Sequence, residues 1–407
     1  EPLAQGDILH SVPFISPAGD LCGDSRVDCE EYDVIVMSHP FAMNPDGTFK
    51  SGYNVSGYFN NYNTGKLSMS LNLNTEKGQE IGYRIIEKSD FFLTNFTPRV
   101  VDKWNLRYDQ ITKVNPSIIA AYAPMQGLEG PHRDFLGFGA VLTPVTGISE
   151  MSGFPNRPPF GIGTNYPDYV INPGHTVTAM LAAHRYRLKT GKGQCVELPQ
   201  LESVVNALGT AVTERLANGT NPTRTGNRHP AYSPHGAFRC ADDPGSVNSP
   251  DRWVVVACRD DAAWMRVAGV LGHGDIAQDG RFNSLVARKD NEDELEGLIN
   301  SWTAGWKAEE LCAALQVAGV PAGVVQNAQD MLDRDPHLKA REYYQYVEHA
   351  EAGREAHDSP AARLSETPGW VPGPAPLMGE HTMDVCERIV GLTMDEIADL
   401  LAEGVLV

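Results

Sequence analysis

Apolar runs and segments of helical spacing alternate along the first half of the chain, at intervals of roughly 15 to 25 residues. Short apolar runs predict strands at residues 8–12, 33–37, 67–73, 91–94, 117–122 and 194–198. Apolar positions at helical spacing predict helices at residues 78–88, from 100 onward, at 173–190 and at 201–216. This rhythm is typical of right-handed βαβ units over a parallel sheet, so the pattern predicts an α/β fold.

Residues 161–193 place one carboxylate immediately ahead of an apolar helix. Asn172 is a residue type that caps helices, Pro173 suits the first helical position, and Gly191 is expected to end the helix. Asp168 lies in a turn before the expected cap, where the positive end of the helix favours a carboxylate or another anion. Aspartate is also a common turn residue, so a purely structural role stays open on the pattern alone.

The second half of the chain begins with a polar stretch. Residues 218–234 are rich in Gly, Pro and Asn and are predicted to form a linker. Strands are then predicted at 236–239 and 253–258, and helices at 262–271, 293–304 and 309–316. This order predicts a second, smaller α+β unit. The remaining segment is rich in proline until an amphipathic helix at 395–401.

Length and charge narrow the class of protein. At 407 residues the chain is too long for one ordinary core, so two domains are expected. Lys and Arg number 33 against 52 Asp and Glu, a net charge of −19, which argues against a nucleic-acid partner. No apolar run approaches the roughly 20 residues that span a bilayer, so no membrane partner is expected. The start of the sequence lacks a signal-peptide pattern, and a cytoplasmic location is expected.

The cysteines do not form a framework. There are 7, scattered along the chain with no C-x-x-C pair. This odd, unclustered set argues against structural disulfides and against a zinc site, so reduced thiols and no metal are expected.

Five different short motifs occur one after another along the chain. They are Gly-Tyr-Phe-Asn-Asn-Tyr-Asn-Thr-Gly-Lys at residues 57–66, Thr-Asn-Phe-Thr-Pro at 94–98, Gly-Leu-Glu-Gly-Pro at 127–131, Thr-Gly-Lys-Gly-Gln at 190–194 and Gly-Glu-His-Thr at 379–382. With the segment 168–197 between them, their order and spacing resemble the family III CoA-transferases (CaiB/BaiF), the group of formyl-CoA transferase and carnitine CoA-transferase. The similarity covers most of the chain.

The resemblance implies that Asp168 is the catalytic aspartate. A carboxylate is an adequate nucleophile toward a thioester, because the CoA thiolate is a good leaving group. Attack gives an acyl-aspartyl anhydride, the thiolate returns to form an aspartyl-CoA thioester, and an incoming carboxylic acid reverses these steps. The expected partners are acyl-CoA and a carboxylic acid, with no metal or redox cofactor.

The resemblance also implies where coenzyme A binds. Lys66, Asn95, Phe96 and Lys103 align with family positions that hold its adenosine and phosphate end. A lysine meets a phosphate as a point charge, and a phenylalanine can stack on adenine. Each lysine is also open to interpretation as an ordinary surface charge.

The acyl group is expected to meet an aromatic residue and a glycine-rich turn. Tyr58 aligns with an aromatic that lines the family's active site, and Gly137 and Phe138 belong to a turn whose backbone N–H groups could stabilise an oxyanion. A packed tyrosine and a plain turn are the alternatives.

Two other functions stay open on the sequence. α-Methylacyl-CoA racemases share the fold but use a histidine beside the glycine-rich loop, where this chain carries a phenylalanine in residues 135–140. The first strands and turns match the family poorly, which also allows a catalytically weak CoA-binding subunit of a hetero-oligomer.

The fold implied by the resemblance is a large Rossmann-like domain with a parallel sheet, plus a smaller inserted α+β domain. The chain would return to the large domain at its end, which gives the boundaries 1–217, 218–234, 235–325 and 326–407. The resemblance further implies an interlocked dimer, a homodimer or a heteromer with a paralogue. The acyl donor and the acceptor acid are not readable from these residues.

Overall fold

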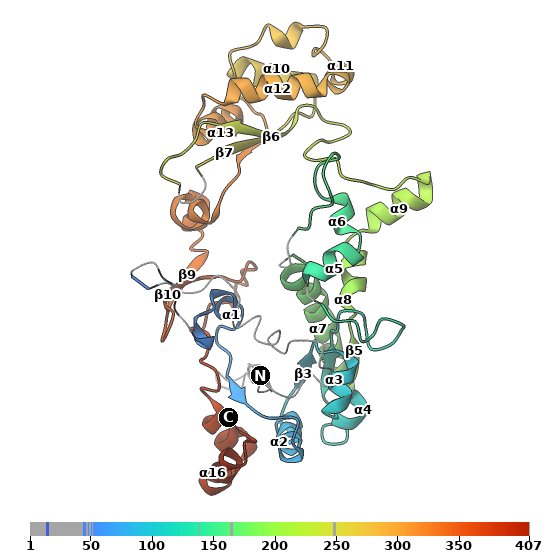
Figure 1. Ribbon diagram of the computed structural model, residues 1–407, viewed down its shortest axis with the longest axis vertical. Helices are drawn as coiled ribbons and strands as arrows, with labels where there is room; N and C mark the ends of the chain where they lie inside the picture. The colour runs from blue at the N-terminus through green and yellow to red at the C-terminus, as the bar shows by residue number, and fades with distance from the viewer. Residues whose placement is uncertain are drawn as a thin grey trace. The chain divides into compact units, whose positions relative to one another are not determined.

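The computed structural model describes residues 14–15, 44–45, 48, 50, 52–137, 139–162, 166–246 and 250–406 (Figure 1). The strands predicted at 8–12 and 33–37 lie outside these residues. The chain divides into two compact units. The first comprises Glu1–Thr146, Gly163–Gly209 and Arg341–Val407, and the second Gly147–Ile162 and Thr210–Ala340. The domain boundaries that the sequence suggests stay a prediction.

A parallel sheet forms the centre of the first unit. Its strand order is β3 (Phe91–Thr94), β4 (Ile119–Tyr122) and β5 (Gln194–Glu197). All four residues of β4 are buried, as expected for a strand covered on both faces. The mixed α/β class and the parallel sheet are therefore confirmed.

Helices cover the two faces of β4. On one face, Ala120 and Tyr122 join the main hydrophobic core with residues of α2 (Glu76–Glu87) and α3 (Pro98–Lys103). On the other face, Ile119 and Ala121 pack with Ala183 of α7 (Asn172–Thr190). Successive side chains of a strand point to opposite faces, so each core takes alternate residues of β4.

The C-terminal segment packs into the same unit. His381 and Thr382 accept hydrogen bonds from the backbone of Ser68 and Ser70 at 3.2 and 3.0 Å. These serines flank or belong to β2 (Met69–Ser70), which pairs in parallel with β1 (Phe14–Ile15). The last helix, α16 (Met394–Ala402), begins at a capping box made by Thr393 and Glu396.

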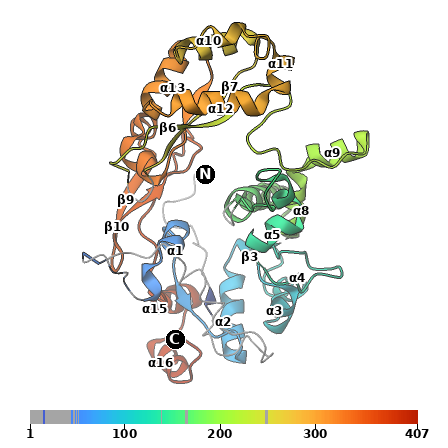
Figure 2. The ribbon, with the colours of Figure 1, turned by 45° about the horizontal axis from the view of Figure 1, so that its top comes forward.

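A β-hairpin in this unit was missed by the sequence pattern. Strands β9 (Tyr344–His349) and β10 (Gly353–Asp358) pair antiparallel. They lie within residues 326–407, where the sequence pattern predicted no strand. Figures 1 and 2 show the hairpin beside α1 (Gly57–Tyr62).

Most sequence-predicted elements of the first unit are confirmed, and two are corrected. The strands at 91–94, 117–122 and 194–198 and the helices at 78–88 and 173–190 match within two residues at each end. The strand expected at 67–73 shortens to Met69–Ser70, and the helix expected at 201–216 is two helices, α8 (Gln200–Asn206) and α9 (Gly209–Asn218). The remaining short elements of the chain are η2 (Tyr53–Val55), α4 (Tyr108–Ile111), α5 (Gly139–Val145), α6 (Ile148–Met151), η3 (Tyr166–Ile171), η4 (Ile276–Gln278), α11 (Leu285–Asp290), η5 (Asp330–Arg334), α14 (Pro336–Ala340), α15 (Thr382–Asp384) and η6 (Val385–Val390).

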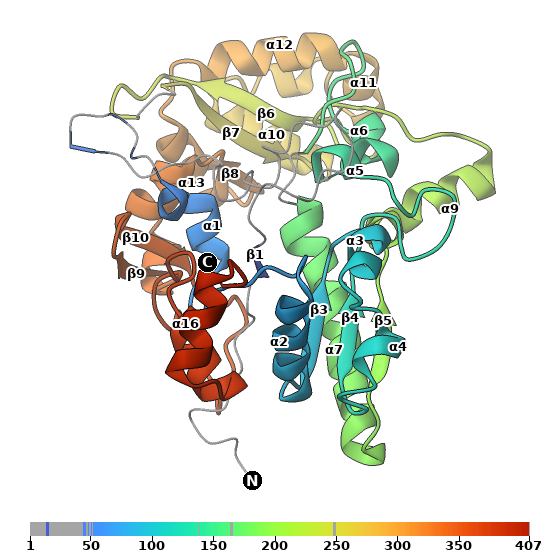
Figure 3. The same cartoon turned by 60° about the horizontal axis from the view of Figure 1, so that its bottom comes forward.

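The second unit is an antiparallel sheet packed on helices, visible at the top of Figure 3. The strand order is β6 (His235–Cys240), β7 (Arg252–Ala257) and β8 (Ala322–Val324). The helices of its core are α10 (Asp261–Val270), α12 (Glu292–Thr303) and α13 (Ala308–Val317). The strands and helices predicted for this α+β unit are confirmed.

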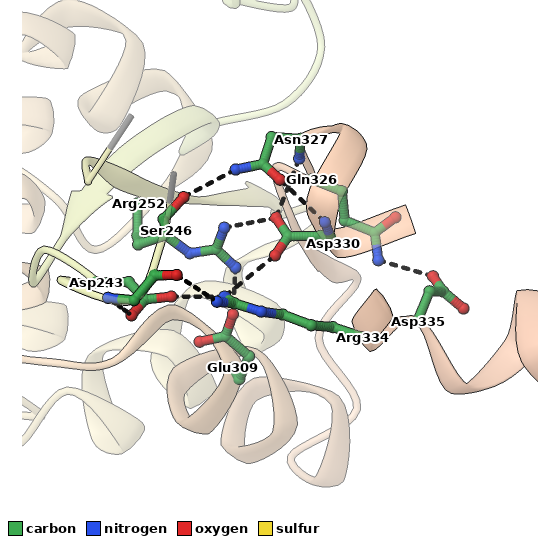
Figure 4. A network of polar contacts seen from close by, with 10 residues as sticks. Asp243, Ser246, Arg252, Glu309, Gln326, Asn327, Asp330, Arg334 and Asp335 are labelled. Atoms are coloured by element: carbon green, nitrogen blue, oxygen red, sulfur yellow. Dashed lines mark hydrogen bonds and ion pairs between the residues drawn. The ribbon is translucent and has the colours of Figure 1, made fainter. Parts of the chain in front are cut away.

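A buried ion pair fastens η5 to β7 in the second unit (Figure 4). Arg252 Nη1 donates to Asp330 Oδ2 at 2.6 Å, and each side chain is 4% exposed. Arg334 extends the network to Asp330 and to Asp243, and the backbone of Asn327 also donates to Asp330 at 3.0 Å. Burial alone would raise the pKa of Asp330, but the hydrogen bonds from Arg252 and Asn327 hold it below the ordinary carboxyl value.

Candidate active site

Asp168 lies at the carboxyl edge of the parallel sheet. It sits in the helical turn η3, which runs directly into α7, and α7 packs against β4 and β5. Helix α7 brings the chain back to the amino end of β5, so its first turn lies where the parallel strands end. Open α/β sheets bind their ligands outside the carboxyl ends of the strands, which makes this edge the candidate active site.

The start of α7 differs from the sequence expectation. Ile171, with helical φ and ψ of −73° and −60°, precedes the helix, and no side chain caps it. The expected cap, Asn172, is instead buried and accepts a hydrogen bond from the Ser203 hydroxyl of α8. Asp168 is therefore on a continuous helical turn and not in a loop. The end of the helix is as predicted, because Gly191 adopts a left-handed φ of 72°.

A backbone donor holds the Asp168 carboxylate. The N–H of Gly139, the first residue of α5, donates to Asp168 Oδ2 at 2.8 Å. Asp168 is half-buried, so its carboxylate is partly exposed while one oxygen is bonded. This contact fixes the orientation of the carboxylate relative to the start of α5.

Three tyrosines gather beside Asp168. Tyr58 and Tyr62 lie one turn apart on α1, and Tyr169 follows Asp168 in η3. Tyr62 stacks on Tyr169 with ring centroids 3.8 Å apart and planes at 9°, and Tyr58 meets Tyr169 edge-on at 5.4 Å. Burial, followed by a hydrogen bond and the nearby Tyr58, raises the pKa of Tyr169 above its ordinary value, with the Asp168 charge contributing. The tyrosine cluster, Tyr58, Tyr62 and Tyr169, thus forms an apolar wall next to the carboxylate.

Sequence reasoning found one member of the tyrosine cluster. Tyr58 was expected in the substrate pocket, and the structure brings it to the turn that carries Asp168. Tyr62 and Tyr169 were missed, although Tyr62 repeats Tyr58 at helical spacing and Tyr169 is adjacent to Asp168.

Gly137 has a packing role next to α5. A Cβ at this position would lie 2.9 Å from the Cβ of Val141 and 3.0 Å from the sulfur of Met125. Only glycine fits this approach without a shift of its neighbours. Phe138, the other turn residue expected in the pocket, lies outside the described residues.

Three of the expected CoA-binding residues follow the carboxyl end of β3. Asn95 is exposed directly after the strand, and the next residue, Phe96, is half-buried. The ring of Phe96 packs edge-on against Trp104 at 5.2 Å, so one side of it belongs to the hydrophobic core. Lys103 is exposed at the last residue of α3, one short helix away from Asn95. Asn95 and Phe96 thus share the sheet edge with Asp168, and Lys103 lies at the far end of α3.

Lys66 lies in the connection between α1 and β2. Its ammonium donates to Asn63 Oδ1 at 3.0 Å. Burial lowers the pKa of Lys66, which is the direction expected for a charge held away from water. Burial removes water that stabilises the charged ammonium, and an anionic ligand beside Lys66 would replace that stabilisation with a charge-assisted hydrogen bond.

A three-ligand metal site and a membrane-spanning helix are both absent from the described part of the chain. These residues contain no group of three or more His, Cys, Asp or Glu side chains arranged to hold a metal ion. Over the same residues, no helix is both long and apolar enough to cross a membrane. The five cysteines that fall within them, Cys195, Cys240, Cys258, Cys312 and Cys386, are free thiols.

The sequence was then compared with known families. The profile described as CoA-transferase family III matches residues 33–382. Succinyl-CoA–D-citramalate CoA-transferase from Chloroflexus aurantiacus is 33% identical over 341 residues, which cover 84% of this chain and 82% of that protein. The beta subunit of succinyl-CoA–L-malate CoA-transferase from the same organism is 27% identical over 344 residues, covering 84% and 82%.

The fold was also compared with solved structures. The crystal structure of a CAIB/BAIF family protein from Brucella suis superposes with a TM-score of 0.77 and 27% sequence identity. The match covers 88% of this chain and 89% of that chain.

Proposed function

The chain belongs to the CoA-transferase family III and is an enzyme of that class, and we propose that it transfers coenzyme A from an acyl-CoA thioester to an acceptor carboxylic acid through Asp168. The observation that carries this proposal is the bond from the Gly139 N–H to Asp168 at the carboxyl edge of the parallel sheet. It presents one nucleophilic carboxylate in a fixed orientation where α/β proteins bind ligands.

The proposed chemistry uses the carboxylate twice. A carboxylate oxygen of Asp168 attacks the thioester carbonyl, the C–S bond breaks, and CoA leaves as a thiolate. The thiolate then attacks the aspartyl carbonyl of the anhydride, which releases the first acid and forms an aspartyl-CoA thioester. The acceptor carboxylate runs the same two steps in reverse. The tyrosine cluster beside Asp168 supports this scheme, since an anhydride survives only where water is kept away.

We propose that Asn95, Phe96, Lys66 and Lys103 hold the nucleotide end of coenzyme A. Asn95 and Phe96 at the end of β3 are placed to meet the adenine, and the exposed part of the Phe96 ring is available for stacking. The two lysines would supply local positive charge to the phosphates in a chain whose net charge is −19. The half-buried Lys66 would gain most from an anionic partner.

We propose a short dicarboxylic acyl group as the donor. Both relatives named above are succinyl-CoA-dependent by name, and the acceptors in their names, D-citramalate and L-malate, are small hydroxy-dicarboxylic acids. A screen that pairs succinyl-CoA with such acids, read by mass spectrometry of the CoA esters, tests the class.

The test of the mechanism is a trapped adduct. Incubation with succinyl-CoA and no acceptor should leave CoA on the peptide that contains Asp168, and hydroxylamine should convert this thioester to a hydroxamate. Asp168→Ala and Asp168→Asn should form no adduct and lose transfer. Asp134→Asn, which alters an exposed aspartate ahead of α5, is the matched control and should keep both. Full transfer by Asp168→Ala would refute the nucleophile.

The same incubation separates the alternatives. A racemase would exchange the α-proton of an α-methylacyl-CoA with deuterium from the solvent and form no adduct. A CoA-binding subunit without activity would bind CoA and give neither adduct nor exchange.

We further propose the interlocked dimer, with a second copy of this chain covering α7 of the first unit. Helix α7 exposes Val177, Leu181 and Leu188 by 54%, 61% and 73%.

Mass photometry tests the assembly. The protein should remain dimeric at nanomolar concentration, and Leu181→Glu should shift it toward monomer. Val317→Glu, at a 92% exposed position of α13 in the other unit, is the matched control. A monomer of the unsubstituted protein would exclude the dimer.

We also propose the domain organisation, with the small domain at 235–325 inserted into a large domain built from both chain ends. Limited proteolysis should cut first within 218–234, the stretch predicted as a linker. Early cuts inside β3 to β5 would contradict it.

A further inference from the structure

Helix α1 is fastened to the β9–β10 hairpin by one buried hydrogen bond. Asn60, 1% exposed on α1, donates through Nδ2 to Glu355 Oε1 of β10 at 2.9 Å. Just before α1, Asn54 donates to Glu351 in the hairpin turn at 2.8 Å. Figures 1 and 3 show α1 beside the hairpin, and the two contacts join α1 and the turn that precedes it to the hairpin.

The bond reaches a buried polar cluster. Glu355 Oε2 lies 3.6 Å from Nε2 of His357, and His349 and His357 are 4% and 2% exposed. Burial alone would raise the pKa of Glu355, but the close contact with His357, the hydrogen bond from Asn60 and the nearby His349 hold it below the ordinary carboxyl value. Glu355 therefore presents an ionised oxygen to Asn60.

Such a cluster costs stability. Five buried polar atoms in it have no hydrogen-bond partner: Asn60 Oδ1, Glu355 Oε2, His349 Nε2, His357 Nδ1 and His357 Nε2. A well-packed apolar cluster would be at least as stable as an incompletely bonded buried ion. The directional bond that Glu355 supplies is what an apolar residue could not replace.

The opposite side of α1 carries two of the tyrosines. Positions 58 and 62 share one helix face, and position 60 lies about 200° from 58 around the helix axis. The Asn60 bond thus sets the rotation of α1 from one side, while Tyr58 and Tyr62 contact Tyr169 from the other.

We propose that Asn60 and Glu355 are positioning residues that hold the tyrosine cluster against the turn of Asp168 and thereby decide whether the aspartyl-CoA thioester is transferred or hydrolysed. The inference rests on the proposed function of Asp168. In hydrolysis, water attacks the aspartyl carbonyl, the C–S bond breaks, CoA leaves as the thiol with one proton of the water, and aspartic acid is restored. Transfer requires the acceptor carboxylate to reach that carbonyl before water does.

The experiment measures the ratio of hydrolysis to transfer. Release of CoA thiol from succinyl-CoA is followed without acceptor, and formation of the new CoA ester is followed with L-malate, or with the acceptor found in the screen. Asn60→Ala and Glu355→Ala should raise the ratio by about tenfold, the effect of losing one hydrogen bond to a charged group. Glu355→Gln, whose amide oxygen still accepts from Asn60, should return the ratio toward that of the unsubstituted protein.

A purely structural role predicts something else. General loss of folded protein lowers hydrolysis and transfer together, so an unchanged ratio in Asn60→Ala and Glu355→Ala overturns the proposal. Where those variants fail to fold, Tyr62→Leu, which is 37% exposed and leaves the hairpin bond intact, should raise the ratio by itself, and an unchanged ratio overturns the proposal equally. An adduct on Asp168 in the unsubstituted protein shows that the proposed function stands in either case.

Discussion

The backbone N–H of Gly139 and the carboxylate of Asp168 are joined by a 2.8 Å hydrogen bond, which ties the first residue of α5 to the turn that leads into α7. The two residues are 29 positions apart in the sequence. The N–H comes from the main chain, so every residue type except proline supplies it at position 139. The carboxylate alone supplies the acceptor.

Removing this donor should slow formation of the adduct. Gly139→Pro deletes the N–H at a position where proline suits a helix start. A hydrogen bond to a charged group contributes about 1.5–3 kcal/mol, so the rate of CoA attachment to Asp168 should fall by about tenfold to a hundredfold. Stopped mixing with succinyl-CoA, followed by intact-protein mass spectrometry, measures this rate.

Gly139→Ala is the matched control, because alanine keeps the N–H. It should retain the rate far better than Gly139→Pro when both have the melting temperature of the unsubstituted protein. Equal loss in the two variants would show that the backbone contact does not orient the nucleophile.

The proposed nucleotide site makes a separate prediction. Lys66→Ala and Lys103→Ala should raise KM for acyl-CoA with a smaller effect on kcat. The reason is that contacts with the distant phosphates stabilise the bound substrate and the transition state equally. Lys113→Ala, at an exposed lysine whose ammonium bonds to Gln110, is the control. Initial-rate kinetics over a range of acyl-CoA concentrations decide the question, and an unchanged KM in both variants would make the two lysines ordinary surface charges.

The local sequence pattern was sufficient to predict the strand and the helix beside the candidate active site. Strand β3 was predicted at its observed bounds because the apolar residues Phe91–Leu93 are followed by the β-branched Thr94, and α7 was predicted to its last residue because glycine, found at 191, is the usual residue after a helix end. The position of Asp168 ahead of a helix drew attention to it, but its catalytic role and the pocket role of Tyr58 were predicted only through the family resemblance, since in local sequence the two look like a turn aspartate and a packed tyrosine.

Long-range packing explains what the sequence could not predict. Asn172 is a residue type that often caps helices, but here its side chain is buried and accepts a hydrogen bond from the hydroxyl of Ser203 on α8. Tyr62 stacks on Tyr169 although the two are more than a hundred positions apart in the sequence. The periodicity of apolar residues predicts helices and strands, and it does not predict contacts between distant residues. The β9–β10 hairpin was missed because its strands mix charged, aromatic and small residues without a clear alternation of apolar and polar positions.

The ion pair of the second unit should matter for stability. Asp330→Ala removes the buried one of the two carboxylate partners of Arg252, whose side chain is 4% exposed, and leaves the guanidinium only its contact with the exposed Glu309. Breaking such a pair costs about 3–5 kcal/mol, which chemical denaturation should report as a lower midpoint. The double variant Arg252→Met with Asp330→Leu should recover part of this loss, since it leaves neither charge buried. A midpoint for Asp330→Ala equal to that of the unsubstituted protein would contradict this role.

The same carboxylate should make stability fall in acid. The pKa of Asp330 is lower in the folded chain than its ordinary value, near 4 in an unfolded chain, so between these two values the unfolded state binds more protons. Its contribution is therefore fully present above about pH 5 and is lost as the pH falls through the folded pKa.

Thermal unfolding of the unsubstituted protein and of Asp330→Asn, measured at steps from pH 7 to pH 3, should reveal this term. The variant should be less stable at neutral pH and should lose less stability below pH 5, because asparagine has no proton to take up. Other carboxylates titrate in both proteins, and the difference between the two curves removes their common contribution. Parallel curves over the whole range would mean that Asp330 has the same pKa in the folded and unfolded chains, against the buried pairing with Arg252 that the structure describes.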